Sequence, residues 1–137
     1  MELTADLAHL DEVARRLLGC LSEHTVVFLR GDLAAGKTTL VQAVAKALGE
    51  TQSVTSPTFS LQHRYGDRLF HYDLYRIDTA EFERLGLIEE FDKRGRHFVE
   101  WGDAELEKLL RFVGYDVVVV NIDHQGDQRR YRITCDA

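Results

Sequence analysis

The stretch GDLAAGKTT, residues 31–39, decides the fold of this chain. It follows the apolar segment TVVFLR, residues 25–30, and leads into the amphipathic run LVQAVAKALG. Residues 31–38 fit the pattern G-x-x-x-x-G-K-[ST] between a predicted strand and a predicted helix, which is the context that gives the pattern its meaning. Small residues let successive backbone N–H groups turn inward around an anion, and a helix that begins near Lys37 points its positive dipole end at the same place. The sequence therefore predicts a phosphate-binding loop.

A nucleoside triphosphate with magnesium is the ligand that such a loop is expected to hold. Lys37 would place a mobile positive charge against the β- and γ-phosphates, and Thr38 would offer a hydroxyl to Mg²⁺. ATP is favoured over GTP because the Asn-Lys-x-Asp element of guanine-specific proteins is missing, and the nearest approach, residues 121–123, lacks the lysine. The residues expected to bind ATP are Gly31, Asp32, Leu33, Ala34, Ala35, Gly36, Lys37, Thr38 and Thr39.

Length and composition place the chain among single-domain globular proteins. Its 137 residues, of which 45% are hydrophobic, suffice for one sizeable core. Lys and Arg total 17 against 23 Asp and Glu, so the net charge is −6. An acidic surface repels a phosphate backbone, which disfavours unaided binding of nucleic acid but not a role in RNA chemistry through a partner.

The sequence also bears on location. We expect no membrane span, because no apolar run approaches the roughly 20 residues that one needs. The acidic start MELTADLAHLDEV predicts no signal peptide. Cys20 and Cys135 lie far apart with no CxxC spacing, which favours two reduced thiols in a cytoplasmic protein.

Hydrophobic periodicity predicts how the chain is organised. Apolar residues recur at helical spacing over residues 6–21, 38–48, 79–91 and 104–112. Strand-like segments are residues 26–29, 58–65, 68–75, 96–99, 115–122 and 130–134. The last two flank HQGDQ, which is typical of a hairpin. We therefore predict one α/β domain over residues 1–137, with a P-loop NTPase-like mixed sheet, flanking helices and a C-terminal β-hairpin.

A phosphate-binding site of this kind needs a carboxylate at the end of an apolar strand, and three residues are candidates. Asp73 ends RLFHYD and Glu100 ends RHFVE. Local sequence does not separate these two, and either could be a solvated carboxylate at a strand end. Asp123 ends VVVVNID, but a second strand follows almost at once, so we expect it at the mouth of the hairpin.

Residues 53–59, SVTSPTF, form a second informative segment. Pro57 biases Ser56 toward an extended backbone. The hydroxyls of Ser56 and Thr58 would then lie where a switch segment could sense the γ-phosphate. The same pattern also suits a turn that begins a strand.

Other segments carry weaker signals. EFERLGLIEEFDKR, residues 81–94, is expected as a surface helix pair, whose apolar Leu87, Ile88 and Phe91 could contact a partner. Six histidines show no metal-ligand spacing and are expected to be structural or solvated: His9, His24, His63, His71, His97 and His124.

Taken together, these elements resemble the bacterial TsaE (YjeE) family of ATPases in tRNA threonylcarbamoyladenosine biosynthesis. The resembling segments span nearly the whole chain: GDLAAGKTT at 31–39, SPTF at 56–59, HYDLYRI at 71–77, LGLIEEF at 85–91 and VEWGD at 99–103. The first is shared by many families, whereas the other four together are far more specific.

The resemblance implies roles for particular residues. Thr38 and Glu100 would coordinate Mg²⁺, and Glu100 is preferred over Asp73 on this ground alone. Lys37, Asp73 and Glu100 would be the catalytic residues, with Asp73 placing water or metal. Trp101 would lie close to the nucleotide, and the segment from Ser56 would be the switch.

Two further points depend on the resemblance. The family loop usually reads GDLGAGKT, and Ala34 replaces its third glycine, which costs on the order of 1 kcal/mol if that position needs a positive φ. In the family the purine pocket involves the N-terminal segment and the C-terminal hairpin, and Arg129 is the residue we would guess from the hairpin.

The implied function is an ATPase that works with TsaD and TsaB, which transfer a threonylcarbamoyl group to N6 of adenosine 37, so the chain would meet tRNA only through its partners. Arg64 and Arg76 are near in sequence, but neither is obviously an arginine finger, so hydrolysis by the isolated chain should be slow. One alternative is a nucleotide-gated binding module without essential hydrolysis. The other is a small-metabolite kinase, although residues 79–96 are too short and acidic for a convincing lid.

Overall fold

The computed structural model describes residues 1–32, 35–50, 52–56 and 59–135. In this part of the chain, strands of one mixed sheet are β1 (Glu2–Ala5), β2 (Thr25–Arg30), β3 (Ser53–Thr55), β4 (Gln62–Tyr65), β5 (Leu69–Asp73), β6 (Arg96–Glu100), β7 (Val117–Gln125) and β8 (Gln128–Thr134). The order across the sheet is β1-β8-β7-β2-β6-β5-β4-β3. The central strands β7, β2, β6 and β5 are parallel, and the outer pairings are antiparallel.

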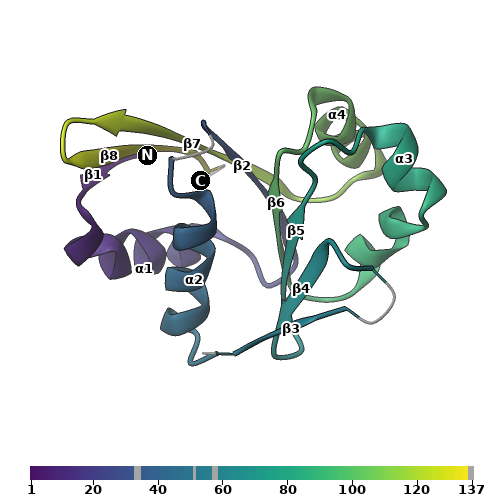
Figure 1. Cartoon of the computed structure of the whole chain (residues 1–137), viewed down its shortest axis with the longest axis horizontal. Helices are drawn as coiled ribbons and strands as arrows, with labels where there is room; N and C mark the ends of the chain where they lie inside the picture. Colours follow the sequence, from purple (N-terminus) through teal and green to yellow (C-terminus); the bar gives the residue numbers. More distant parts are fainter. Residues whose placement is uncertain (33–34, 51, 57–58, 136–137) are drawn as a thin grey trace.

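Helices cover both faces of this sheet (Figure 1). They are α1 (Leu10–Cys20), α2 (Lys37–Ala47), α3 (Thr79–Arg84) and α4 (Ala104–Val113), with short 3-10 helices η1 (Leu7–His9) and η2 (Leu87–Asp92). Helices α1 and α2 pack on one face, and α3, η2 and α4 on the other. The predicted fold class is thus confirmed, including the C-terminal hairpin of β7 and β8. No helix in the described ranges is long and apolar enough to cross a bilayer.

Strand alternation decides which side chains reach each face. In β2, Val27 and Leu29 pack toward α1 and α2, whereas Val26 and Phe28 pack toward the other core. The strand is buried on both faces, which is why its sequence is a continuous apolar run. In β5, Phe70 and Tyr72 face the α3 and α4 side. His71 and Asp73, which alternate with them along β5, therefore face α2.

Several elements differ from the sequence-based expectation. Both edge strands β1 and β3 were missed, because each is short and largely exposed. The predicted helix over residues 79–91 is divided at Gly86, where φ is +80° and α3 gives way to η2. Leu87 and Phe91 are fully buried in the core beneath α3, so the expectation that they face a partner is wrong.

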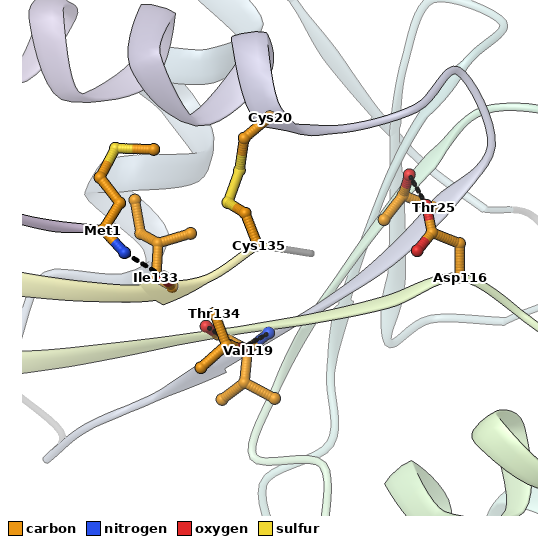
Figure 2. Close-up of a disulfide and its surroundings, with 8 residues drawn as sticks. All are labelled: Met1, Cys20, Thr25, Asp116, Val119, Ile133, Thr134 and Cys135. Carbon is orange, nitrogen blue, oxygen red and sulfur yellow. Dashed lines mark hydrogen bonds between the residues drawn. A yellow bond between two sulfur atoms is a disulfide. The ribbon is translucent and has the colours of Figure 1, made fainter. Parts of the chain in front are cut away.

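The cysteines form a disulfide, so the expectation of two reduced thiols is also wrong (Figure 2). Cys20 ends α1 and Cys135 follows β8, with their Cα atoms 6.1 Å apart across a sequence separation of 115. Beside them, the Met1 amino group donates to the Ile133 carbonyl at 2.9 Å, which ties the chain start to the same strand. The cysteines therefore give no support to the expected reducing cytoplasm.

Reduction should destabilise the protein markedly. A cross-link that closes a loop of this length restricts the unfolded chain, which in the chain-entropy model stabilises by about 4 to 5 kcal/mol. We expect dithiothreitol to lower the urea midpoint of the wild type and to leave a Cys20→Ser/Cys135→Ser double variant unchanged. Identical midpoints for the wild type with and without reductant would contradict this.

Candidate functional site

The glycine loop, defined as residues 31–36, joins β2 to α2. At Gly31 an added Cβ would lie 2.6 Å from the Ile122 carbonyl oxygen and 2.9 Å from the Ala35 Cβ, so only glycine fits. Gly36 caps α2 with φ +97°, a conformation that glycine adopts without steric cost. Leu33 and Ala34 lie outside the described residues, so the effect of Ala34 in place of the glycine of the family loop remains a prediction. The described part of the loop is thus held closely against β7.

Arg129 supports this loop from β8. Its Nε donates to the Ala35 carbonyl at 3.2 Å. The residue guessed as a purine contact therefore touches the main chain of the glycine loop, and its contact with a base remains a prediction.

Lys37 is buried at the first position of α2. Its Nζ donates to the carbonyl oxygens of Gly31 at 2.5 Å and Asp32 at 3.1 Å. The same atom lies 3.6 Å from the centroid of the Trp101 ring, a cation–π contact. Burial lowers the pKa of Lys37 below its usual 10.5, although the charges of Glu100, Asp32 and Asp73 oppose that shift. The ammonium group is thus held inside the loop by groups that a ligand could replace.

Glu100 ends β6 and is buried, with 5% of its surface exposed. Its Oε2 accepts a hydrogen bond from Thr38 Oγ1 at 2.7 Å and another from His71 Nε2. Burial by itself would raise the pKa of Glu100. The hydrogen bonds from His71 and Thr38, helped by the charge of Lys37, instead lower the pKa below its usual 4.5. The side chain is therefore a carboxylate at neutral pH.

Asp73 lies beside Glu100. The two residues are register partners at the ends of β5 and β6, and strand alternation places both on the α2 face. Asp73 is exposed, and its Oδ1 accepts from the Tyr75 backbone N–H at 3.1 Å. The structure therefore brings the two carboxylates that local sequence could not separate to one edge of the sheet, next to Lys37 and Thr38.

Asp123 has different surroundings. It lies on β7 opposite Arg130 of β8, and Arg132 Nη2 donates to its Oδ2 at 2.9 Å. The third candidate carboxylate is thus part of the hairpin, as expected, and is paired there with arginine.

The Trp101 segment is fixed by groups that sequence reasoning missed. Trp101 itself has a left-handed backbone, with φ +63°. Arg30, which ends β2, donates from Nη1 to the Gly102 carbonyl at 2.7 Å and from Nη2 to Glu107 at 2.6 Å. A Cβ on Gly102 would lie 2.5 Å from the Phe28 ring. These contacts hold the Trp101 indole over Lys37. The sequence marked Arg30 only by its position at the end of an apolar strand.

The proposed switch segment is described only in part. Ser56 Oγ accepts from the Phe59 N–H at 3.1 Å, and the Ser56 N–H donates to the Gln62 carbonyl at 2.9 Å. These bonds connect the residue that follows β3 with Phe59 and with the first residue of β4. Thr58 lies outside the described residues, so the switch role of both remains a prediction.

An open groove of about 750 Å³ runs between the N-terminal segment and α2. Thr39, directly after the proposed metal ligand Thr38, lines one part of it. Leu7 lines another part and is 72% exposed. The groove thus lies between η1, α1 and α2, and Thr39 brings its lining into the first turn of α2, which follows the glycine loop.

The donor set suits magnesium better than a transition metal. Within the described ranges, no group of three or more His, Cys, Asp or Glu side chains is arranged to hold a metal. The site instead offers the hydroxyl of Thr38 and the carboxylate of Glu100. Magnesium is commonly bound by one or two carboxylates together with substrate phosphates and water.

Strand β2, the glycine loop and α2, set in a sheet with parallel central strands, define a P-loop-like α/β domain. The family model described as threonylcarbamoyl adenosine biosynthesis protein TsaE matches residues 4–132. The chain therefore belongs to the TsaE family, which is involved in tRNA threonylcarbamoyladenosine biosynthesis.

Known relatives agree with this assignment. The TsaE protein of Haemophilus influenzae is 35% identical over 112 residues, 79% of this chain and 68% of the relative. That of Bacillus subtilis is 45% identical over 108 residues, covering 77% and 65%. That of Treponema pallidum is 40% identical over 110 residues, covering 78% and 79%. The matches thus span about two thirds of the first two relatives.

A solved structure supports the same fold. Bacillus subtilis YdiB superposes with a TM-score of 0.61 at 26% identity, over 100% of this chain and 87% of that chain.

Replacing Gly31 should test how closely the loop is packed. Gly31→Ala forces a Cβ into the Ile122 carbonyl, and overpacking of this kind costs about 1 to 3 kcal/mol. Gly19→Ala is the matched control, because nothing lies within 4 Å of its added Cβ in α1, and helix propensity predicts a gain of about 1 kcal/mol. Urea unfolding measures both changes, and a Gly31→Ala protein as stable as the wild type would refute the close approach.

Proposed function

We propose that this chain is a Mg²⁺-dependent P-loop ATPase that supports threonylcarbamoyl modification of tRNA. The observation that carries the proposal is the hydrogen bond between Thr38 and Glu100 beside the buried ammonium of Lys37. These are the three groups that a phosphate-binding loop needs for metal and triphosphate, and they meet in a member of the TsaE family.

Lys37 would bind the triphosphate by exchanging partners. Its bonds to the Gly31 and Asp32 carbonyls can be replaced by phosphate oxygens, which carry full negative charge and attract the ammonium more strongly. Until a phosphate binds, the Trp101 ring stabilises the ammonium through the cation–π contact at 3.6 Å. A groove lined by Leu7 and Thr39 offers room for the nucleoside.

Thr38 and Glu100 would hold the metal. A bound Mg²⁺ would neutralise charge that develops on the phosphates during transfer. Glu100 is ionised and already hydrogen-bonded to Thr38, so both oxygens needed are close together in the protein. Asp73, which is exposed beside Glu100, would orient an attacking water.

The partners proposed are TsaD and TsaB, and the isolated chain should turn over slowly. Arg76 lies over the Tyr75 ring, with 5.2 Å from Cζ to the centroid, and Arg64 lies over Phe70 in the opposite face of the sheet. Both candidate fingers are therefore stacked on aromatic rings. A cation supplied by a partner can raise phosphoryl transfer by about 10³- to 10⁵-fold.

The kinase alternative is less well supported. Phe82, Leu87 and Phe91 anchor residues 79–92 in the core, which does not suit a lid that must open and close over a second substrate. A nucleotide-gated binding module would use the same site residues as an ATPase. An experiment with the partner proteins distinguishes these two functions.

Removing the Lys37 ammonium should abolish ATP binding without unfolding the domain. The wild type should gain about 2.7 kcal/mol in unfolding free energy at 100 times its ATP dissociation constant, and Lys37→Ala should gain nothing. Lys108→Ala, an exposed lysine on α4, is the control and should behave as wild type. Glu100→Ala should retain some ATP binding and lose Mg²⁺-dependent hydrolysis, whereas normal hydrolysis by this variant would move the metal role to Asp73.

Partner coupling has its own test. We expect phosphate release to rise when purified TsaD and TsaB are added, with no phosphorylated small molecule formed. Equal turnover with and without them would argue against coupling. Full activation of the partners by a non-hydrolysable ATP analogue would favour the nucleotide-gated module.

A further inference from the structure

His71 is a buried side chain that contacts the proposed metal ligand Glu100. It lies on β5 with 5% of its surface exposed. Its Nε2 meets Glu100 Oε2, the same oxygen that accepts the Thr38 hydroxyl. One carboxylate oxygen is therefore held from two sides, by a residue of α2 and by a residue of the neighbouring strand.

Strand geometry explains how the imidazole reaches Glu100. Alternation along β5 puts His71 and Asp73 on the α2 face, since Phe70 and Tyr72 between and before them pack on the other. In the register, Asp73 is opposite Glu100 and His71 is opposite Phe98. His71 is thus the diagonal neighbour of Glu100 on the same face, which is within reach of a long side chain.

A carboxylate held at a single point can rotate about its last torsion, which has broad wells. The hydrogen bond from Thr38 holds the carboxylate at one point, and its donor lies on α2, which packs against the sheet. The His71 bond comes from the strand next to β6 and adds a second point of attachment. Two donors on one oxygen leave the carboxylate a single favourable orientation.

We propose that His71 is a positioning residue that orients Glu100 for the metal. The inference rests on the proposed function, because it assigns His71 a role only if Glu100 faces Mg²⁺. Partners that hydrogen-bond a metal-ligating carboxylate commonly change metal affinity by about 10- to 100-fold when they are removed. His71 therefore sets how strongly Mg²⁺ tightens nucleotide binding, and it does not itself touch the nucleotide.

The test separates metal binding from catalysis. The dissociation constant of ATP is measured by calorimetry with Mg²⁺ and again with EDTA, and the ratio gives the tightening due to the metal. We expect His71→Leu to bind ATP in EDTA within about threefold of wild type and to lose about tenfold or more of the Mg²⁺ tightening. His71→Gln, whose amide N–H can replace the Nε2 donor, should restore most of it.

His63→Leu is the matched control. His63 lies opposite His71 on β4, with ring centroids 6.1 Å apart, and hydrogen-bonds Thr55. A general effect of removing an imidazole from this sheet would lower the Mg²⁺ tightening in this variant too. The positioning role predicts that it stays at the wild-type value.

The outcomes are distinct. A wild type that binds no ATP overturns the proposed function and the role of His71 together. A wild type that binds ATP with Mg²⁺ tightening that His71→Leu retains overturns the role of His71 alone. If His71→Leu does not fold, His71→Gln is compared with His71→Asn, whose shorter amide cannot reach Glu100; equal Mg²⁺ tightening in those two variants also overturns it.

Discussion

The hydrogen bond from Thr38 to Glu100 is the contact on which the candidate site depends. It joins the first turn of α2 to the carboxyl end of β6 across 62 positions of sequence. Because β2, β5 and β6 run parallel, β2 delivers the glycine loop to the edge where the other two strands end. That shared edge allows the ammonium and the hydroxyl at the start of α2 to meet two carboxylates that end two different strands.

The candidate site also contains two buried charged side chains. Lys37 and Glu100 are both almost inaccessible, and burying a lone charge is costly. Main-chain carbonyls and the Trp101 ring satisfy the ammonium, while Thr38 and His71 satisfy the carboxylate. Each group is thus hydrogen-bonded by partners that are weaker than a phosphate or a metal.

Predictions from sequence succeeded where the pattern was long or the motif specific. The buried run of β2, the helix after Lys37 and the hairpin followed from periodicity and turn residues alone. They failed where the deciding contacts are distant in sequence. The amphipathic pattern around Leu87 is the same whether its apolar face packs in a core or against a partner protein. Only the packing beneath α3 shows that this face is part of the core. The spacing of Cys20 and Cys135 could not show that the two sulfurs meet.

The sequence by itself determined that a glycine loop with Lys37 and Thr38 lies between a strand and a helix, because backbone conformation there depends on local residue type. It left Asp73 and Glu100 as equals, since both are simply acids at strand ends. Tertiary structure decided that Glu100 is buried against Thr38 and that Asp73 remains exposed beside it. It also brought His71 and Arg30 to the site. The reason is that register and strand order, which set these contacts, arise from pairing between distant segments and leave no local signature.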